Sequence, residues 1–124
     1  MTDTATKIAA VQTYVDGFAA GNADIISTMF ADDATLEDPV GTDMIVGRQA
    51  IHEFYVGAVA TGAKLTMLGE PRCAADFVAF PFSVAFSFEG QASVIEVIDT
   101  FKFNDDGKII EMKAYWGPEN MKSA

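Results

Sequence analysis

One acidic residue stands on an otherwise apolar face in the segment between Val94 and Asn104. Side chains of a strand alternate between its two faces, so the face of Asp99 also carries Ile95, Val97, Phe101 and Phe103. A carboxylate on such a face loses its hydration, which raises its pKa and favours the neutral acid, a hydrogen-bond donor. The pattern leaves two other interpretations open, namely a bulge that turns Asp99 outward and a buried hydrogen bond with a purely structural role.

Asp38 shows a weaker form of this pattern, on a face that it shares with Leu36 and Val40. An aspartate before a proline is also common in turns, so this pattern alone favours a structural role. Two carboxyl groups on apolar faces can, however, be held in opposite protonation states, which is what one general base and one acid require at neutral pH. Tyr14 adds a third polar group at the edge of an apolar helical stripe, although ordinary packing with its hydroxyl at the surface is the alternative.

Other site chemistries have little support in the sequence. His52 is the sole histidine, and because it follows the core-facing Ile51 it is expected to face solvent. No second His or Cys stands at ligand spacing, so we expect no metal site. There is no glycine-rich phosphate loop and no Gly-x-Ser-x-Gly motif. The single Cys73 cannot form an intramolecular disulfide, and no signal-like apolar run occurs near the N-terminus, so a reducing, cytoplasmic location is expected.

The composition indicates one soluble globular domain spanning residues 1–124. Half of the 124 residues are hydrophobic, which a disordered chain of this length would not be. The formal net charge of −10 opposes binding to nucleic acid and to anionic membranes. Ten Phe, three Tyr and one Trp are more aromatic side chains than a core of this size needs.

Helical patterns occupy the first half of the chain. Apolar residues recur at helical spacing over Thr4–Ala20, before Gly21, and again over Gly47–Ala60. Between them, Asp24 is expected to cap a short helix that contains Ile25, Ile26, Met29 and Phe30. The pair Asp32 and Asp33 is expected to end this helix in a turn.

The rest of the chain reads as strands joined by turns. The predicted strands are Thr35–Val40, Lys64–Leu68, Arg72–Phe80, Phe82–Glu89, Ala92–Asn104 and Lys108–Trp116. Helices followed by hairpin-linked strands predict an α+β fold with an antiparallel sheet.

Two of these strands have a clear dry face, so helices and sheet could enclose a space lined by aromatic rings. One dry face consists of Phe82, Val84, Phe86 and Phe88, and the other of Ile110, Met112, Ala114 and Trp116.

Four segments together resemble the bacterial Δ5-3-ketosteroid isomerases. They are Phe30-Ala-Asp-Asp-Ala-Thr-Leu-Glu-Asp-Pro-Val-Gly41, Gly47-Arg48 leading to Glu53-Phe-Tyr55, Val97-Ile-Asp99 and Met112-Lys-Ala-Tyr-Trp116. The first segment alone is shared by many proteins of the nuclear transport factor 2-like fold, whereas the combination of Tyr14, Asp38 and Asp99 is more specific. The resemblance covers the chain from Tyr14 to Asn120 and implies the conical, cystatin-like architecture, a curved antiparallel sheet packed with three N-terminal helices.

The resemblance also implies a mechanism. Asp38 would be the general base that moves a proton from C4 to C6 of a 3-oxo-Δ5-steroid through a dienolate. Tyr14 and a protonated Asp99, the latter a known property of the family, would donate hydrogen bonds to the C3 oxygen. Tyr55 would bond to Tyr14, and because Phe30 stands where some members have a further tyrosine, this network would end at Tyr55.

The resemblance further implies a homodimer without a cofactor and a steroid pocket. The expected pocket residues are Phe54, Phe82, Val84, Val97, Phe101, Met112, Ala114 and Trp116. Each of them could instead be ordinary core packing.

Other functions occur on the same fold, so the fold alone does not decide between them. The sequence leaves open a non-catalytic steroid- or lipid-binding module and a polyketide cyclase-like enzyme. An epoxide hydrolase of this fold is expected to use an Asp-Arg-Asp relay. Arg48 and Arg72 are the only arginines, and neither falls on an apolar face between carboxylates.

Overall fold

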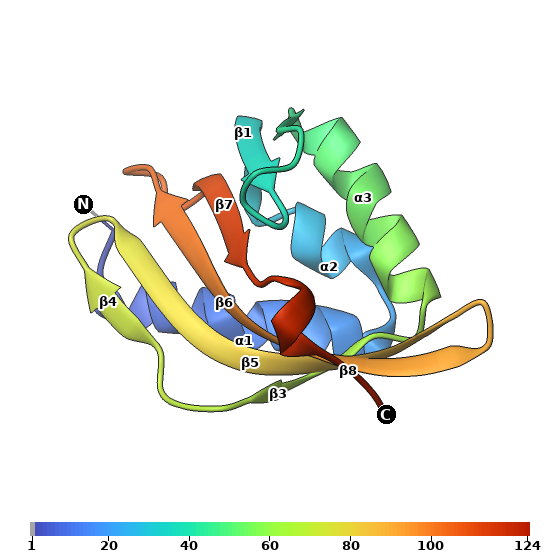
Figure 1. The fold of residues 1–124 in the computed structure, drawn as a ribbon. Helices are drawn as coiled ribbons and strands as arrows, with labels where there is room; N and C mark the ends of the chain where they lie inside the picture. The colour runs from blue at the N-terminus through green and yellow to red at the C-terminus, as the bar shows by residue number, and fades with distance from the viewer. Residues whose placement is uncertain (1) are drawn as a thin grey trace.

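A strongly curved sheet and three α-helices build the structure, a computed structural model that describes residues 2–124 (Figure 1). The helices are α1 (Thr4–Ala20), α2 (Ala23–Ser27) and α3 (Arg48–Ala60), with a short 3₁₀ helix η1 (Pro118–Asn120) near the C-terminus. The strands are β1 (Phe30–Glu37), β2 (Ile45–Val46), β3 (Lys64–Met67), β4 (Arg72–Ala74), β5 (Phe77–Phe88), β6 (Gln91–Phe103), β7 (Ile109–Tyr115) and β8 (Met121–Ser123). The predicted α+β class with three helices is confirmed.

The sheet is mixed rather than purely antiparallel. Its strand order is β2-β1-β7-β6-β5-β3, with β4 paired to β5 and β8 paired to β6. The long β5–β6 hairpin forms its curved centre (Figure 1). The antiparallel prediction is wrong for one pair, since β1 runs parallel to β7. Parallel strands need a long crossover, and the chain between β1 and β7 provides one that includes α3.

Helix α1 has the predicted bounds but presents a different face to the core. The Asp3 side chain accepts a hydrogen bond from the Thr6 amide at its start, and Gly21 ends it at φ 63°, a conformation that glycine adopts without strain. Ile8, expected on the buried stripe, is exposed. Tyr14 lies in the middle of the buried face, not at its edge. The buried residues of α1 are Lys7, Val11, Tyr14, Gly17 and Phe18.

The second helix is shorter than predicted because the sheet takes over its last residues. Its cap is Asn22, whose side chain accepts from the Asp24 amide, and it ends at Ser27. Phe30 instead begins β1, where it pairs with Ile109 and buries its ring completely. Asp32 and Asp33, expected to form a turn, therefore continue β1, with an irregular register against β7.

Several strand boundaries also differ from the predictions. The predicted strand Arg72–Phe80 is interrupted at Ala75, and its second part continues through Pro81 to Phe88 as the single strand β5. Phe88 does not extend the dry face, because it lies near the hairpin tip with 60% of its surface exposed. The short strands β2 and β8 were not predicted.

The last long strand has a shifted dry face. Its register against β6 shifts between Lys102 and Phe103, so Ile109, not Ile110, is buried in line with Met112 and Ala114. An irregularity of this kind moves side chains to the opposite face, and a strict alternation cannot anticipate it.

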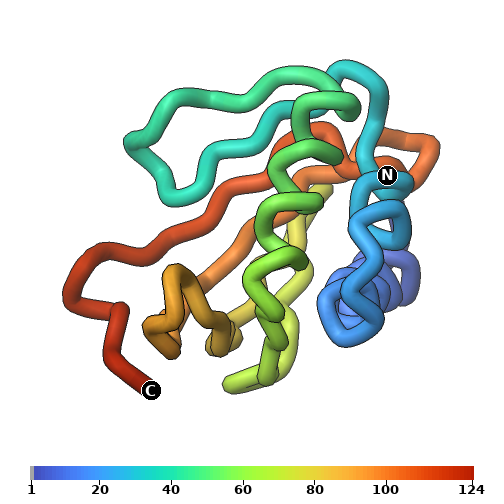
Figure 2. Tube along the Cα trace, turned by 90° about the vertical axis from the view of Figure 1, so that its right-hand side faces the viewer, coloured from blue at the N-terminus to red at the C-terminus, as the bar shows by residue number. Residues whose placement is uncertain are grey.

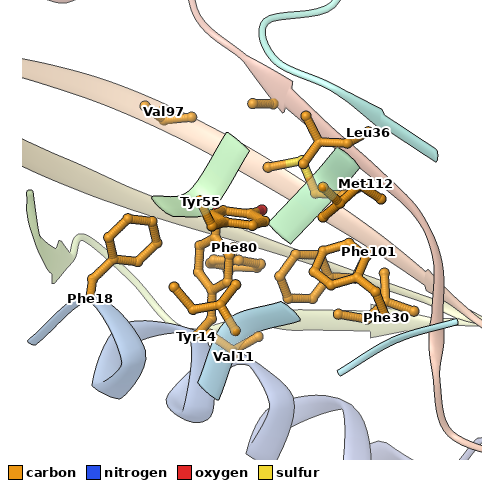
Figure 3. Close-up of a cluster of buried hydrophobic side chains, with 14 of the residues drawn as sticks. Val11, Tyr14, Phe18, Phe30, Leu36, Tyr55, Phe80, Val97, Phe101 and Met112 are labelled. Carbon is orange, nitrogen blue, oxygen red and sulfur yellow. The ribbon is translucent and has the colours of Figure 1, made fainter. Parts of the chain in front are cut away.

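The core lies between the sheet and the helices and is rich in aromatic rings. Tyr14 packs edge-on against Phe18, Tyr55, Phe80 and Phe101, at ring distances between 5.2 and 5.9 Å (Figure 3). Figure 2 shows that the chain between β1 and β2 forms an open loop on the side of the molecule away from α1. No helix within residues 2–124 has the length and apolarity needed to cross a bilayer.

Candidate active site

A cavity of about 300 Å³ opens between the helices and the inner face of the sheet. Its polar side-chain atoms come from Tyr14, Asp38, Tyr55, Asp99 and Trp116, and the rest of the lining is apolar. The apolar lining consists of Phe18, Phe54, Ala58, Leu65, Phe82, Val84, Phe86, Ile95 and Val97. A few convergent polar groups in an apolar cavity are typical of small-molecule sites.

The structure divides the predicted pocket residues into two groups. Phe54, Phe82, Val84, Val97 and Trp116 line the cavity. Phe101, Met112 and Ala114 do not line it, because they are fully buried in the core. Phe101 packs against the ring of Tyr14 at 5.2 Å, so this residue supports a lining residue instead of forming the lining itself.

Five lining residues were not predicted as pocket residues. They are Phe18, Ala58, Leu65, Phe86 and Ile95. Spacing could have found four of them, since Phe18 and Ala58 follow Tyr14 and Phe54 by one helical turn, and Phe86 and Ile95 lie two strand residues from Val84 and Val97. Leu65 pairs with Val84 across β3 and β5, a register that only the structure shows.

Asp99 is the most unusual group of the cavity. It lies in the middle of β6, between Phe80 of β5 and Ala114 of β7, and only 1% of its surface is exposed. Neither carboxyl oxygen has a hydrogen-bonding partner within residues 2–124. The outward bulge and the structural hydrogen bond, the two other interpretations of the sequence pattern, are therefore wrong for this residue.

The surroundings of Asp99 favour its neutral form. Burial raises the pKa of this carboxyl well above its ordinary value of 3.8, and the charge of Asp38 raises it further. The Tyr14 hydroxyl opposes the rise, although it does not complete a hydrogen bond with Asp99. A neutral carboxyl without a protein partner is free to donate a hydrogen bond to a ligand in the cavity.

Tyr14 presents the second hydroxyl donor to the same space. Its hydroxyl lies 3.1 Å from that of Tyr55, and the two rings, from α1 and α3, meet edge to face. Burial raises the pKa of both phenols well above 10, so both remain neutral at physiological pH. The alternative that Tyr14 keeps its hydroxyl at the surface is wrong, since the side chain is buried.

The tyrosine network ends at Tyr55 within the described residues. The ring of Phe30 lies 5.9 Å from that of Tyr55 and offers no hydroxyl to extend it. When the Tyr14 proton points at a ligand, the Tyr55 hydroxyl can donate to the Tyr14 oxygen, because either hydroxyl of this pair can be the donor.

Asp38 reaches the cavity from a bend, whereas Tyr14 and Asp99 lie on a helix and a strand. It does not lie in a strand, as predicted, but in a bend after β1 that includes the cis peptide bond to Pro39. Val40, expected on the same apolar face, is exposed. Asp38 is partly buried because of the bend and the cavity, not because of strand alternation.

The carboxyl group of Asp38 is partly desolvated and accepts one hydrogen bond. The indole nitrogen of Trp116 donates to its Oδ1 at 2.9 Å. Burial raises the pKa of Asp38 above 3.8, and the Trp116 bond partly offsets this rise by stabilising the ionised form. Asp38 is thus suited to be a carboxylate with enough basicity to accept a carbon-bound proton.

His52 lies outside the cavity and in less contact with solvent than expected. Its Nδ1 lies 2.8 Å from the Ser27 hydroxyl and 3.6 Å from Asp24. Both partners contact the same ring nitrogen, which differs from a nucleophilic triad, where the hydroxyl and the carboxylate use opposite nitrogens.

Taken together, the cavity combines the carboxyl group of Asp38 with the Tyr14 hydroxyl and with an Asp99 carboxyl whose surroundings favour its neutral form. A carbonyl oxygen placed between Tyr14 and Asp99 would gain stabilisation as negative charge develops on it, while Asp38 accepts a proton from the adjacent carbon. The arrangement can therefore enolise a ketone of mostly apolar structure.

Comparison with known proteins decides the family. A SnoaL-like domain model matches residues 11–112. The chain belongs to the SnoaL-like family, within the nuclear transport factor 2-like fold. This SnoaL-like protein is 45% identical over 113 residues to the steroid Delta-isomerase of Nocardioides simplex, a match that covers 91% of each chain. The resemblance to the ketosteroid isomerases is thereby confirmed.

Two further relatives of this SnoaL-like protein carry other names. The epoxide hydrolase LasB of Streptomyces lasalocidi is 33% identical over 104 residues, which are 79% of this chain but 36% of LasB. The solved structure of the epoxide hydrolase/cyclase-like enzyme SalBIII superposes with a TM-score of 0.92 over the full length of both chains, at 27% identity. The fold is therefore shared between different activities, and the site must distinguish them.

Proposed function

We propose that this protein is a steroid Δ5-isomerase that converts 3-oxo-Δ5-steroids to 3-oxo-Δ4-steroids. The observation that carries the proposal is the unpartnered, buried Asp99 carboxyl in an apolar cavity that also contains Tyr14 and Asp38. The 45% identity to a steroid Delta-isomerase supports the same conclusion. A flat, largely apolar steroid with one ketone matches a cavity whose few polar groups come from five residues.

In the proposed reaction Asp38 is the only proton carrier. Its carboxylate removes a proton from C4, and the electrons of that C–H bond form a dienolate with negative charge on the C3 oxygen. The protonated Asp38 then returns the same proton to C6, and the double bond moves from C5–C6 to C4–C5. Atoms and electrons balance within the steroid, so the step needs no cofactor.

Tyr14 and Asp99 are the proposed oxyanion hole of this reaction. Both donate to the C3 oxygen as its charge grows, and both work in a cavity with mostly apolar walls, where a hydrogen bond to a developing charge is strongest. Tyr55 stabilises the arrangement by donating to Tyr14.

The direct experiment is an isomerisation assay with 5-androstene-3,17-dione. The conjugated 4-ene-3-one product absorbs in the ultraviolet, so turnover is visible without coupling enzymes. We expect rapid turnover by the wild-type protein. Tight steroid binding without this absorbance would support the non-catalytic binding module instead.

A cyclase or epoxide hydrolase activity is less well supported, despite the likeness to SalBIII and LasB. The cavity lining contains no arginine for the expected Asp-Arg-Asp relay. Arg48 instead pairs with Asp32 at 2.9 Å, and Arg72 bonds to the Glu70 carbonyl.

We also propose that the protein is a homodimer that pairs through the outer face of its sheet. Ile98, with 50% of its surface exposed, lies between Pro81 and Tyr115 on neighbouring strands, next to the exposed Leu68. The same face carries Glu96 and Lys113, so two copies related by a two-fold axis could place opposite charges together.

Light scattering should give twice the chain mass for the wild type and the monomer mass for Ile98→Glu. A monomeric wild type at micromolar concentration would contradict the proposal.

A further inference from the structure

Asp38 lies in a bend that several hydrogen bonds close. The Glu37 side chain accepts a hydrogen bond from the Gly41 amide at 2.8 Å, across the residues that carry Asp38. The Thr42 amide and the Thr42 hydroxyl both donate to the Pro39 carbonyl, at 3.1 and 2.7 Å. These bonds join Glu37 to Gly41 and Pro39 to Thr42, so they close the bend around Asp38.

A fourth hydrogen bond ties the bend to the sheet. The Val40 amide donates to the Ala114 carbonyl at 2.9 Å, which continues the contact between β1 and β7 past the end of β1. Ala114 is also the register partner of Asp99 on β6. The bend that carries Asp38 is therefore bonded to the same residue of β7 that pairs with Asp99.

Of these contacts, only the Glu37 bond joins residues on either side of Asp38. Glu37 is the last residue of β1, is paired with Lys113 in the register of β7, and does not line the cavity. Removing its carboxylate leaves Asp38, Trp116 and both oxyanion donors in place. The carboxylate accepts the hydrogen bond of the Gly41 amide that closes the turn, so its removal opens this contact.

We propose that Glu37 is a positioning residue that holds the Asp38 turn in its proton-transfer geometry through its bond to the Gly41 amide. This inference rests on the proposed isomerase function. Proton transfer between a carboxylate and carbon depends steeply on geometry, so a looser turn lowers the rate of the chemical step. Steroid binding is left unchanged, because Tyr14, Asp99 and the apolar walls lie on other elements.

Three variants separate positioning from charge. Glu37→Ala removes the acceptor, whereas Glu37→Gln removes the charge and keeps a carbonyl oxygen that can accept from Gly41. Asp33→Ala is the matched control, since it removes one exposed negative charge from the same strand. We expect Glu37→Ala to lower kcat about three- to tenfold with KM unchanged, the scale of one hydrogen bond. Glu37→Gln should recover most of the lost rate, and Asp33→Ala should match the wild type.

Amide hydrogen exchange at Gly41 provides a measurement that does not depend on activity. It should accelerate in Glu37→Ala and remain near the wild-type rate in Glu37→Gln. A kcat of Glu37→Ala within twofold of the control, an unchanged Gly41 exchange rate, or equal losses in the alanine and glutamine variants would each overturn the inference. An inactive wild type would overturn the proposed function instead, and the exchange rates would then decide alone whether Glu37 holds the turn.

Discussion

Asp99 and Asp38 carry the same functional group on two contrasting supports. Asp99 is part of a regular ladder, with a paired strand on each side and no hydrogen bond to its carboxyl oxygens. Asp38 lies in a bend outside the ladders, with Trp116 bonded to its carboxyl and Glu37 holding the turn. The position of Asp99 is fixed by the strand pairing of its backbone, whereas the position of Asp38 depends on side-chain hydrogen bonds.

In the proposed mechanism, this difference lets one cavity hold an acid and a base at the same pH. Full burial without a partner raises the pKa of the Asp99 carboxyl, which favours its neutral form. The hydrogen bond from Trp116 stabilises the Asp38 carboxylate, so its pKa rises less. The ionised Asp38 in turn favours the neutral form of Asp99, which couples the two roles.

Removing the base should produce the largest effect. We expect Asp38→Asn to lower kcat by more than the ~10⁴-fold usually assigned to general acid–base catalysis, because no other cavity group is placed to carry the proton. Steady-state assays with 5-androstene-3,17-dione measure the change. A loss below tenfold would mean that another group carries the proton.

Removing the acid should have the second largest effect. Asp99→Leu and Tyr14→Phe each delete one oxyanion donor and should cost on the order of 10²–10³ in kcat. Asp99→Asn, whose amide can still donate, should lose less than Asp99→Leu. If Asp99→Leu unfolds the protein while Asp99→Asn keeps the full rate with its thermal stability intact, donation from position 99 suffices and the acid itself is not required.

The protonation of Asp99 should also be visible in the stability of the protein. Because the folded pKa lies well above the unfolded one, the folded state retains a proton that the unfolded state loses above about pH 4. This contribution is greatest below the unfolded pKa and is lost as the pH rises toward the folded pKa, by about 1.4 kcal/mol per pH unit. Urea unfolding should therefore show a steeper fall with pH for the wild type than for Asp99→Asn. Parallel curves would indicate an ordinary pKa for Asp99.

A smaller effect is expected when the partner of Asp38 is removed. Trp116→Phe keeps the ring but deletes the indole donor that lowers the Asp38 pKa. The acid limb of the pH–rate profile should move to higher pH, because Asp38 must be ionised to act. At a pH above this limb any loss in kcat should stay within about tenfold, because the higher basicity of Asp38 partly offsets the loss of the contact that positions its carboxylate. An unshifted acid limb would show that this bond does not set the basicity of Asp38.

The smallest effect should come from the end of the tyrosine network. Tyr55→Phe leaves Tyr14 and its proton in place and removes the donor behind it. One buried hydrogen bond predicts a loss in kcat of about two- to tenfold. A loss as large as that of Tyr14→Phe would mean that Tyr55 itself contacts the substrate.

The same contrast describes what the sequence could predict. Strand alternation placed Asp99 on the inner face correctly, because β6 is regular from Gln91 to Lys102. The helical pattern of α1 predicted its bounds, but it placed Tyr14 at the edge of the buried stripe and left the burial of its hydroxyl open. Regular elements impose a fixed period on their side chains, so their faces can be derived from spacing.

Irregular backbone was not predictable in this way. Asp38 was assigned to a strand face, but it lies partly buried in a bend. The bend is held by hydrogen bonds that the amides of Val40, Gly41 and Thr42 donate. The bulge opposite Phe103 likewise moved the dry face from Ile110 to Ile109. The parallel pairing of β1 with β7 and the cavity residue Leu65 depend on contacts between distant segments, which local spacing does not contain.

The central claim is that Asp99 is protonated while Asp38 is ionised, and carboxyl ¹³C NMR tests it directly. Protein labelled at the aspartate carboxyl carbons would be titrated from about pH 4 to pH 9, with Asp38→Asn and Asp99→Asn assigning the two resonances. We predict that the Asp99 carboxyl keeps the shift of a neutral acid at pH 7, where Asp38 already shows that of a carboxylate. An Asp99 resonance that is ionised at pH 7, or that titrates below Asp38, would contradict the account.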